Sequence, residues 1–231
     1  MHLNLKLSGL ALGLAAALGL LSAMPASAQD QWDGFYFGKH VGYGTAHREG
    51  CTSYSFTLYA PESCDYGSGP IEINTDYAGW LIGKQAGVNF QSSNIVFGVE
   101  IAASWVNLDS IDQFDGINGI DWIVTGTGRV GFTTGNVLFY GEAGIGAAAF
   151  NYGPNGAGCE FNSILTGLVL GGGIEALLGD NVSIFGEVNH IGFQPSQASC
   201  NNIDSGAWPS SFSDTQTSAL LFKVGVNWHA N

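Results

Sequence analysis

Large apolar residues alternate with small or polar ones along most of this chain after about residue 32, and turn-forming residues separate the alternating segments. A period of two residues is typical of β-strands, and no segment after residue 28 shows the period of a helix. The pattern predicts eight strands, at residues 33–47, 76–90, 95–107, 120–133, 136–150, 163–178, 181–193 and 216–229.

The connections between the predicted strands are of two kinds. Three are tight and rich in turn-forming residues, QSSN at 91–94, TTGN at 133–136 and LGDN at 178–181, and the other four are long and polar. Short turns that alternate with long loops are typical of an outer-membrane barrel. The sequence therefore predicts an all-β fold, an eight-stranded antiparallel transmembrane β-barrel with four long extracellular loops, three short periplasmic turns and both termini in the periplasm.

The alternation also predicts which face of each strand meets lipid. In residues 95–107 the large apolar side chains share one face, and Gly98, Glu100, Ala102 and Ser104 share the other. We expect the large face to contact lipid and the face of small residues to line a narrow lumen. The same rule applied to WDGFYFGKHVGYG, residues 32–44, predicts Phe35, Phe37, Val41 and Tyr43 toward lipid, Trp32 and the Phe/Tyr pair near the headgroups, and Gly34, Gly38, Gly42 and Gly44 inward.

Composition supports a membrane protein and argues against nucleic acid as a partner. Charged residues make up only 11% of the chain, which is low for a water-soluble surface, yet no later segment reaches the roughly 18 apolar residues of a spanning helix. Only six Lys and Arg residues oppose nineteen Asp and Glu, so the net charge is −13, and a nucleic acid, whose phosphates are bound by Lys and Arg, is not an expected partner. A soluble secreted β-protein is the alternative.

The first 28 residues have the features of a signal peptide. An apolar run ends in PASA, where Ala26 and Ala28 supply the small residues that signal peptidase requires. We expect cleavage after residue 28 and a barrel domain at residues 29–231. A membrane anchor is the alternative, although glycine and serine interrupt the apolar run.

Charged side chains are predicted inside the barrel. An eight-stranded barrel has a lumen that side chains fill, so carboxylates there require partners. One interpretation is a structural plug of salt bridges, and another is a narrow, gated, cation-preferring path. Four glutamates against two basic residues also require a protonated glutamate or ordered water. The predicted lumen charge network is Glu100, Arg129, Glu142, Glu175, Glu187 and Lys223, with His40, Gln85 and Asn89 as neutral neighbours.

Two lysines do not fit the predicted faces. Lys39 and Lys84 fall on the lipid-facing side near the middle of their strands. A lysine there costs about 2–4 kcal/mol at the bilayer midplane. A bulge or snorkelling of the side chain toward the interface would reduce that cost.

The four cysteines fall in predicted outer loops. Passage through the periplasm permits disulfides, and four thiols allow three pairings, of which we favour Cys51 with Cys64 and Cys159 with Cys200. A zinc site is disfavoured because no C-x-x-C motif or pair of histidines accompanies them. We expect no cofactor and no metal, since the acidic loop with Asp109, Asp112 and Asp115 lacks the spacing of an EF-hand. Loop aromatics that could contact a partner or fold onto the barrel mouth are Tyr54, Phe56, Tyr59, Tyr66, Trp208 and Phe212.

Several motifs together resemble the small eight-stranded outer-membrane surface antigens of Gram-negative bacteria, the opacity-like, porin-like family. The opening WDGFYFGKHVGYG is similar to the first strand of that family, and GKQAGVNFQ, GRVG, LFYGEAGIG and GGGIEALLGDNVSIFGEV follow in the family's order. The resemblance implies an integral outer-membrane protein with a structural role and antigenic or adhesive loops. Its implied partners are outer-membrane lipid, lipopolysaccharide, the barrel-assembly machinery and a surface partner. The chain departs from the family at its last strand, where three residues follow Trp228.

A catalytic function is the remaining alternative. Some eight-stranded barrels deacylate lipid A with a lipid-facing histidine and a serine two residues away. His190 has a suitable position, but the residue two positions later is Gly192. We therefore expect no catalysis.

Overall fold

The computed structural model describes residues 31–54, 71–110, 117–155, 159–195, 197–200 and 210–230. Among these residues, no helix is long and apolar enough to cross a membrane. The described ranges consist almost entirely of strands: β1 (Gly34–Tyr54), β2 (Ile71–Ser92), β3 (Ile95–Ser110), β4 (Ile117–Thr134), β5 (Val137–Asn155), β6 (Cys159–Leu177), β7 (Val182–Phe193), β8 (Gln197–Cys200) and β9 (Ser210–Ala230).

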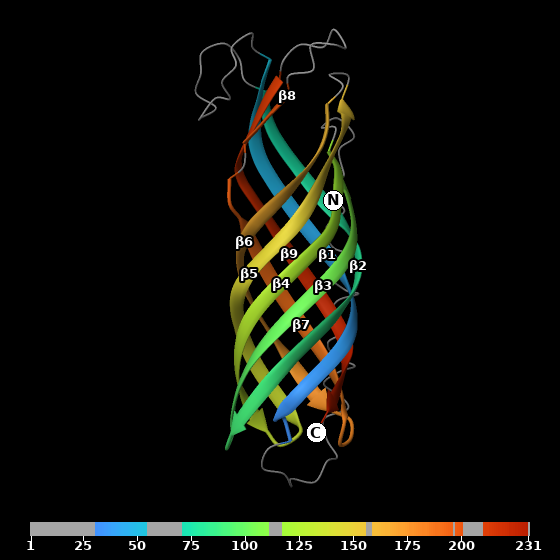
Figure 1. Cartoon of the computed structure of the whole chain (residues 1–231), viewed down its shortest axis with the longest axis vertical. Coiled ribbons are helices and arrows are strands. Elements are labelled where there is room, and N and C mark those ends of the chain that lie inside the picture. The colour runs from blue at the N-terminus through green and yellow to red at the C-terminus, as the bar shows by residue number, and fades with distance from the viewer. Residues whose placement is uncertain are drawn as a thin grey trace, which may run out of the picture.

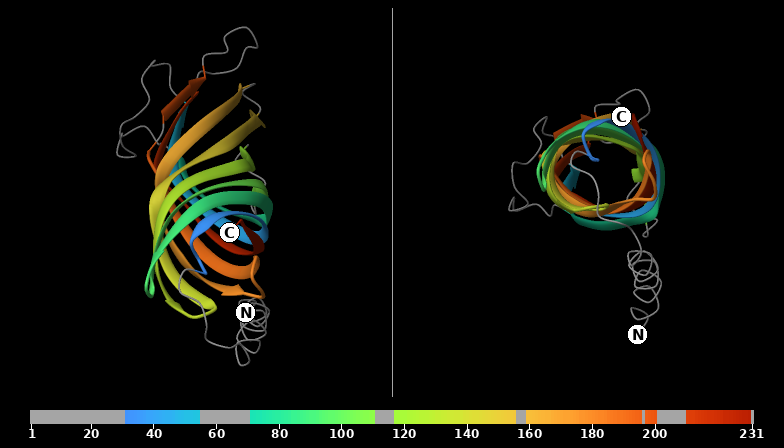
Figure 2. Two further views of the ribbon diagram at one scale, coloured as in Figure 1. Left: turned by 60° about the horizontal axis from the view of Figure 1, so that its bottom comes forward. Right: turned by 90° about the horizontal axis from the view of Figure 1, so that it is seen from below.

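Eight of these strands form one closed antiparallel barrel. Each of β1 to β7 pairs with the next in the chain, β7 pairs with β9, and β9 pairs with β1 to close the ring. The tilted strands form a tall cylinder in Figure 1, and the view along the axis in Figure 2 shows the closed ring. The short strand β8 pairs with β9 beyond the ring. The predicted eight-stranded antiparallel barrel is confirmed, and β8 is an addition that the alternation did not predict.

The strands extend farther than the sequence pattern predicts, mainly at the end away from the tight turns. β1 continues to Tyr54 and β2 starts at Ile71, whereas the predicted limits were residues 47 and 76. Backbone pairing continues there because ladder hydrogen bonds do not require alternating side chains. Cys51, Cys159 and Cys200, expected in loops, accordingly belong to the strands β1, β6 and β8.

Tight turns connect the strands at the other end, which we call the turn end; the opposite end is the loop end. The residues between β2 and β3 and between β4 and β5 form turns. Ser93 and Gly135 there have positive φ values of 56° and 67°. That backbone conformation is common in short hairpin turns. Both β1 and β9 have their terminal ends, Gly34 and Ala230, at the turn end.

Large apolar side chains cover the outside of the barrel as a belt. On β1 this apolar belt runs from Phe35 to Tyr43. Phe37 stacks on Trp228 toward the turn end, with ring centroids 5.7 Å apart, and Tyr43 meets Trp80 edge to face farther toward the loop end. Aromatic rings are typical of the two interfaces of a membrane-spanning barrel. The predicted lipid-facing direction of Phe35, Phe37 and Val41 agrees with their exposure.

The inside of the barrel contains two clusters of large apolar side chains, so the expectation of an inner face made mostly of small residues is wrong. The loop-end apolar layer includes Leu81, Leu108, Ile120, Phe150 and Leu221. The turn-end apolar layer consists of Trp32, Val96, Leu138, Tyr140 and Leu177. Small residues line the lumen where polar side chains cross it; a side chain at Gly83, for example, would clash with the imidazole of His40 and the carbonyl of Ala103.

Candidate functional site

The six residues predicted to form a lumen charge network lie on the inner wall between the two apolar layers. They come from β3, β4, β5, β6, β7 and β9, one from each strand, and all are buried or nearly so. The inward positions follow from the period of two along each strand. The structure brings the six side chains together in one polar layer, within which five form two ion-paired groups and Glu142 belongs to neither.

Arg129 is at the centre of the first group. Its Nη1 atom lies 3.4 Å from Glu175 and 3.8 Å from Glu100, and its Nε atom donates to Asn89 at 2.9 Å. The guanidinium also lies over the ring of Tyr36, 4.4 Å from the centroid. Only 4% of Arg129 is exposed, so these contacts replace water as the partners of a buried cation.

Glu175 carries the densest set of partners in this layer. Its Oε1 atom accepts hydrogen bonds from Ser183 and, at 2.7 Å, from Asn227, and lies 3.4 Å from Nε2 of His229. Because Arg129 binds the other oxygen, both lone-pair-bearing atoms of this fully buried carboxylate are satisfied. Such coordination permits an ionised carboxylate inside a barrel.

Lys223 and Glu187 form the second group. Their Nζ and Oε1 atoms are 2.5 Å apart, and the residues are register partners on β9 and β7. Tyr140 donates to the second oxygen of Glu187 at 2.7 Å, and Asn189 donates to the first, also at 2.7 Å. This pair is therefore fixed by its own strands and by hydrogen bonds from both sides.

Glu142 is the carboxylate of this layer that lacks a basic partner among the described residues. It lies directly opposite Arg129 in the pairing of β4 and β5, but the guanidinium turns away from it toward β3 and β6. Thr127 donates to its Oε2 atom at 2.9 Å, whereas Oε1 is buried without a hydrogen-bond partner. With all groups ionised, the four glutamates exceed the two cations of the layer by two charges.

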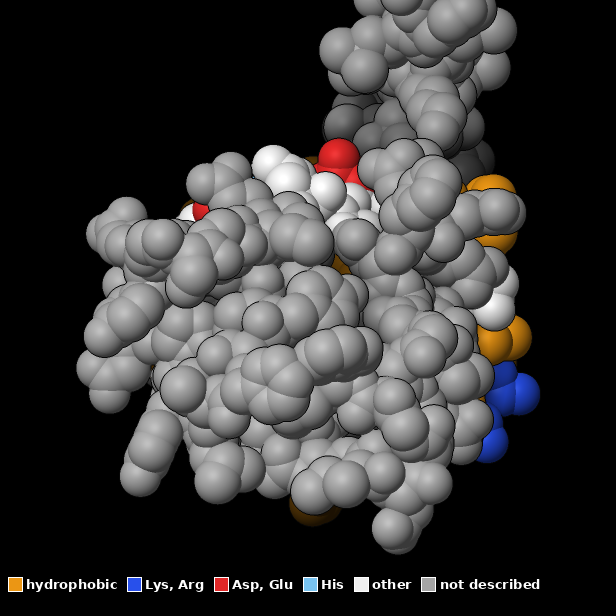
Figure 3. Space-filling view, turned by 90° about the horizontal axis from the view of Figure 1, so that it is seen from above, with side chains coloured by type: hydrophobic (Ala, Val, Ile, Leu, Met, Phe, Trp, Pro, Cys, Tyr) orange, Lys and Arg blue, Asp and Glu red, His pale blue; other side chains and the backbone are white. Residues whose placement is uncertain are grey.

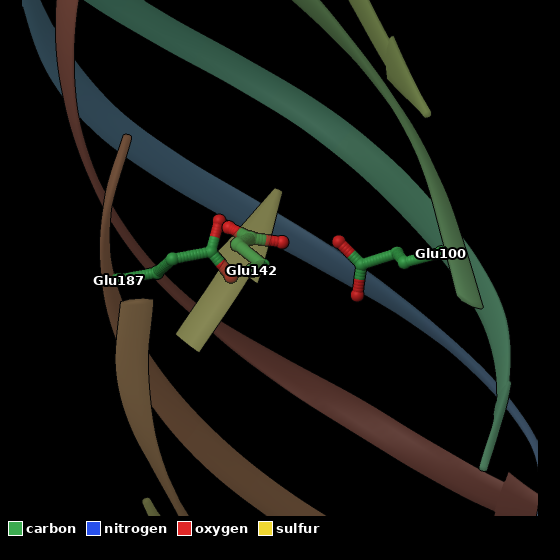
Figure 4. A group of neighbouring side chains, drawn as sticks. All are labelled: Glu100, Glu142 and Glu187. Carbon is green, nitrogen blue, oxygen red and sulfur yellow. The ribbon is translucent and has the colours of Figure 1, made fainter. Parts of the chain in front are cut away.

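Three of these carboxylates form the arrangement closest to a metal site in the described part of the chain. Oxygen atoms of Glu100, Glu142 and Glu187 lie within 4.8 Å of one another. Figure 4 shows Glu142 beside Glu187, with Glu100 reaching toward them from the opposite wall. Oxygen ligands of this type suit Ca²⁺ or Mg²⁺. Glu187 already pairs with Lys223, and Glu100 accepts a hydrogen bond from Tyr36, so two of the three carboxylates have partners before any cation is added.

The neutral residues predicted beside the network also line the lumen. His40 contacts Gln85 at 2.6 Å through Nδ1 and Ser104 at 2.8 Å through Nε2, and Gln85 donates to Asn227 at 2.7 Å. These bonds connect the neighbouring strands β9, β1, β2 and β3 along one wall of the lumen. They extend the polar layer without adding charge.

Sequence reasoning missed several members of the network. Strand parity places Tyr36 and Tyr140 inward, and that signal could have identified them, but the Phe/Tyr pair that includes Tyr36 was predicted near the headgroups. The correction is clearest for Trp32, which is fully buried and donates from Nε1 to the carbonyl of Gly135 at 3.2 Å. It packs with Val96, Leu138 and Leu177 in the turn-end apolar layer.

Other predicted features fall outside the described part of the structure. The signal peptide, Cys64, the acidic positions Asp112 and Asp115, and the loop aromatics Phe56, Tyr59, Tyr66 and Trp208 lie outside the described residues. For Cys51, Cys159, Cys200, Asp109, Tyr54 and Phe212, only the backbone is described. The disulfide pairing stays a prediction. His190 lies on the outer face, and Gly192 is its outward neighbour two positions later.

Comparisons with known proteins agree with this barrel. The 25 kDa outer-membrane immunogenic protein of Brucella melitensis biotype 1 is 28% identical over 205 residues, covering 87% of this chain and 80% of that protein. The 22 kDa outer membrane protein of Rhizobium leguminosarum bv. viciae is 22% identical over 204 residues, covering 88% of this chain and 82% of that protein. Both are named as outer-membrane proteins.

The fold is also that of a solved barrel. The crystal structure of OprG, an outer membrane protein from Pseudomonas aeruginosa, superposes with a TM-score of 0.50 and 15% identity, covering 87% of this chain and all of that chain. The family described as outer membrane protein beta-barrel domain matches residues 13–229. This chain therefore belongs to the outer membrane protein β-barrel family and is a protein of the Gram-negative outer membrane.

Proposed function

We propose that this protein is a closed structural barrel of the outer membrane, with loops that act as contact or antigenic surfaces and with no catalytic activity. In this proposal the turn end and both termini face the periplasm, and the loop end faces the outside of the cell. The lumen carries no steady ion current.

The observation that carries the proposal is the order of layers inside the barrel. The polar network lies between the loop-end apolar layer and the turn-end apolar layer. Ile123 and Leu221 in the first layer and Leu138 in the second are each at most 1% exposed. An ion that crossed the lumen would lose its water at both apolar layers, which is costly. This arrangement favours the plug over the cation-preferring path.

The contact role of the loops is supported by the relatives. The Brucella melitensis protein is named as an outer-membrane immunogenic protein, and this name supports an antigenic surface in the present chain. In this chain the strand ends on either side of residues 55–70, 111–116 and 156–158, and those of β7 and β9 on either side of the last connection, lie at the loop end, opposite the tight turns. We infer that these connections form the outer surface.

Planar-bilayer recording of the refolded protein tests the closed lumen. We expect no discrete steps from the wild type or from Arg129→Ala, because both keep the two apolar layers. Leu108→Ser with Leu221→Ser opens the loop-end layer, and brief openings in that variant would show that silence does not come from failed insertion. Reproducible wild-type steps that change in Arg129→Ala would contradict the plug and favour a porin.

Surface labelling tests the orientation and the role of the loops. An epitope inserted between residues 60 and 61 should bind antibody on intact cells, while the same epitope at the turn after Thr134 should bind only after the cells are opened. The reverse pattern would contradict the orientation. Altered lipid A after overexpression would contradict the absence of catalysis.

A further inference from the structure

Two lysines on the outer wall have no role in the closed barrel. Lys39 on β1 and Lys84 on β2 are direct register partners, and both side chains are exposed on the lipid-facing side. Figure 3 shows Lys and Arg side chains projecting beside hydrophobic ones at one edge of the molecule. The other Lys and Arg side chains in the described part of the chain, Arg48, Arg129 and Lys223, are buried.

Their surroundings make this position unfavourable for a free pair of cations. Along β1 the neighbours on the same face are Phe37 and Val41, and both are exposed members of the apolar belt. Like charges placed directly opposite on paired strands repel each other, and a lysine facing lipid is unfavourable at depth. Neither ammonium has an ion-pair partner among the described residues. An anionic partner from outside the chain would therefore stabilise the pair.

The depth of the two lysines in the membrane indicates at which end of the barrel the anionic partner binds. Lys39 pairs with Val226, which is two residues from Trp228 on β9. On the outer face, Trp228 and Phe37 form an aromatic stack between this level and the turn end. Two residues span roughly 7 Å along a strand, and the tilt of the strand reduces this in height. A lysine that snorkels over this short distance reaches the interface at the turn end.

Small residues beside Lys84 leave room for its side chain to extend toward the turn end. Ala86 follows Lys84 toward the turn end on the same face, and Ala103 is the partner of Lys84 on β3. In the other direction, Ile82 and Trp80 are large and exposed. Lys84 can therefore extend over Ala86 toward the turn-end interface. Lys39 lies directly beside it, with Phe37 as its own neighbour in that direction, so both ammonium groups can reach one headgroup.

We propose that Lys39 and Lys84 form a binding site for the phosphate of an anionic phospholipid in the leaflet at the turn end of the barrel. A phosphodiester supplies the negative charge that the pair lacks, and its acyl chains lie against the apolar belt. The site is selective because a zwitterionic headgroup carries its own cation. The protein as a whole has a net charge of −13, so general electrostatic attraction does not explain a preference for anionic lipid.

Native mass spectrometry of the refolded protein tests this site. The protein in neutral detergent is given equal amounts of phosphatidylglycerol and phosphatidylcholine. We expect about thirtyfold preferential retention of phosphatidylglycerol, from roughly fivefold for each lysine near an anionic headgroup. Lys39→Gln with Lys84→Gln should abolish the preference, and Lys39→Arg with Lys84→Arg should keep it. Heat-modifiable migration on a gel confirms that each variant has folded.

Three results would overturn the proposal. Equal retention of the two lipids by the wild type would show that the pair does not select anionic headgroups. A preference that persists in the double Gln variant would place the site elsewhere. Stronger retention of lipid A than of phosphatidylglycerol in a second competition would assign the pair to the leaflet at the loop end. The unfolding temperature of the wild type, measured with each lipid, is an independent test that needs no variant and should rise more with phosphatidylglycerol.

Discussion

Removal of the central cation of the lumen should destabilise the barrel strongly. Arg129→Met keeps a long apolar stem and deletes the guanidinium. The change leaves Glu175 without the group 3.4 Å from its Oε2 atom, Glu100 without the group at 3.8 Å, and Asn89 without its donor at 2.9 Å. All of these changes occur where water is largely excluded.

The expected loss is about 3 kcal/mol in the free energy of unfolding. Breaking a buried ion pair by removing one partner costs roughly 3–5 kcal/mol, because the other charge is left uncompensated. We expect the lower end of this range for two reasons. Glu175 keeps its hydrogen bonds from Ser183 and Asn227, and Glu100 keeps the one from Tyr36.

Equilibrium unfolding in urea, with the protein refolded in lipid vesicles, measures this loss. The double variant Arg129→Met with Glu175→Gln should recover part of the lost stability, because the amide of Gln leaves no unpaired charge in the lumen. The coupling energy between the two sites should fall in the range of about 0.5–3 kcal/mol for residues in contact. If Arg129→Met lowered the free energy of unfolding by less than about 1 kcal/mol, as is typical of exposed ion pairs, the reasoning would be refuted. It would also be refuted if the effects of Arg129→Met and Glu175→Gln were strictly additive in the double variant.

Two further predictions concern strand packing and pH. Gly144→Ala should destabilise the barrel by about 1–3 kcal/mol, because a Cβ there would clash with the carbonyl oxygen of Gly126. Gly126→Ala faces open space and should change stability by less than about 0.5 kcal/mol, so equal effects in urea unfolding would contradict the packing. His47 lies beyond the apolar belt, where hydrogen bonds to Asp76 at 2.7 Å and then to Glu49 at 3.2 Å raise its pKa above the usual value of about 6.5. The protonated form of His47 should stabilise the fold by less than about 1 kcal/mol, because the group is so exposed. This contribution should be complete below about pH 6.5 and should be lost as the pH rises through the raised pKa. Asp76→Asn should lower the pKa of His47 measured by NMR, and an unchanged value would contradict the assignment.

The sequence by itself determined the eight barrel strands and which residues of each face inward, although not the full length of the strands or the additional strand β8. These properties are local, because the period of two repeats at every strand and short turns alternate with long loops. Parity alone placed Glu100, Arg129, Glu142, Glu175, Glu187 and Lys223 inward and Lys39 and Lys84 outward, as the structure has them. The family resemblance rested on short motifs that follow one another along the chain, and the comparisons confirm it.

The tertiary structure alone decided which partners meet inside the lumen. Arg129 and Glu142 are direct partners in the pairing of β4 and β5, yet Arg129 pairs with Glu175 and Glu100 instead. Strand parity shows that a side chain points inward but not which side chain of another strand it meets. Trp32 precedes the first strand, so no alternation could assign it to the turn-end layer. Closure of the ring brings opposite walls together, and the reach of each side chain across the lumen then selects its partner. That distance depends on the register of all eight strands together, which no single segment of sequence contains.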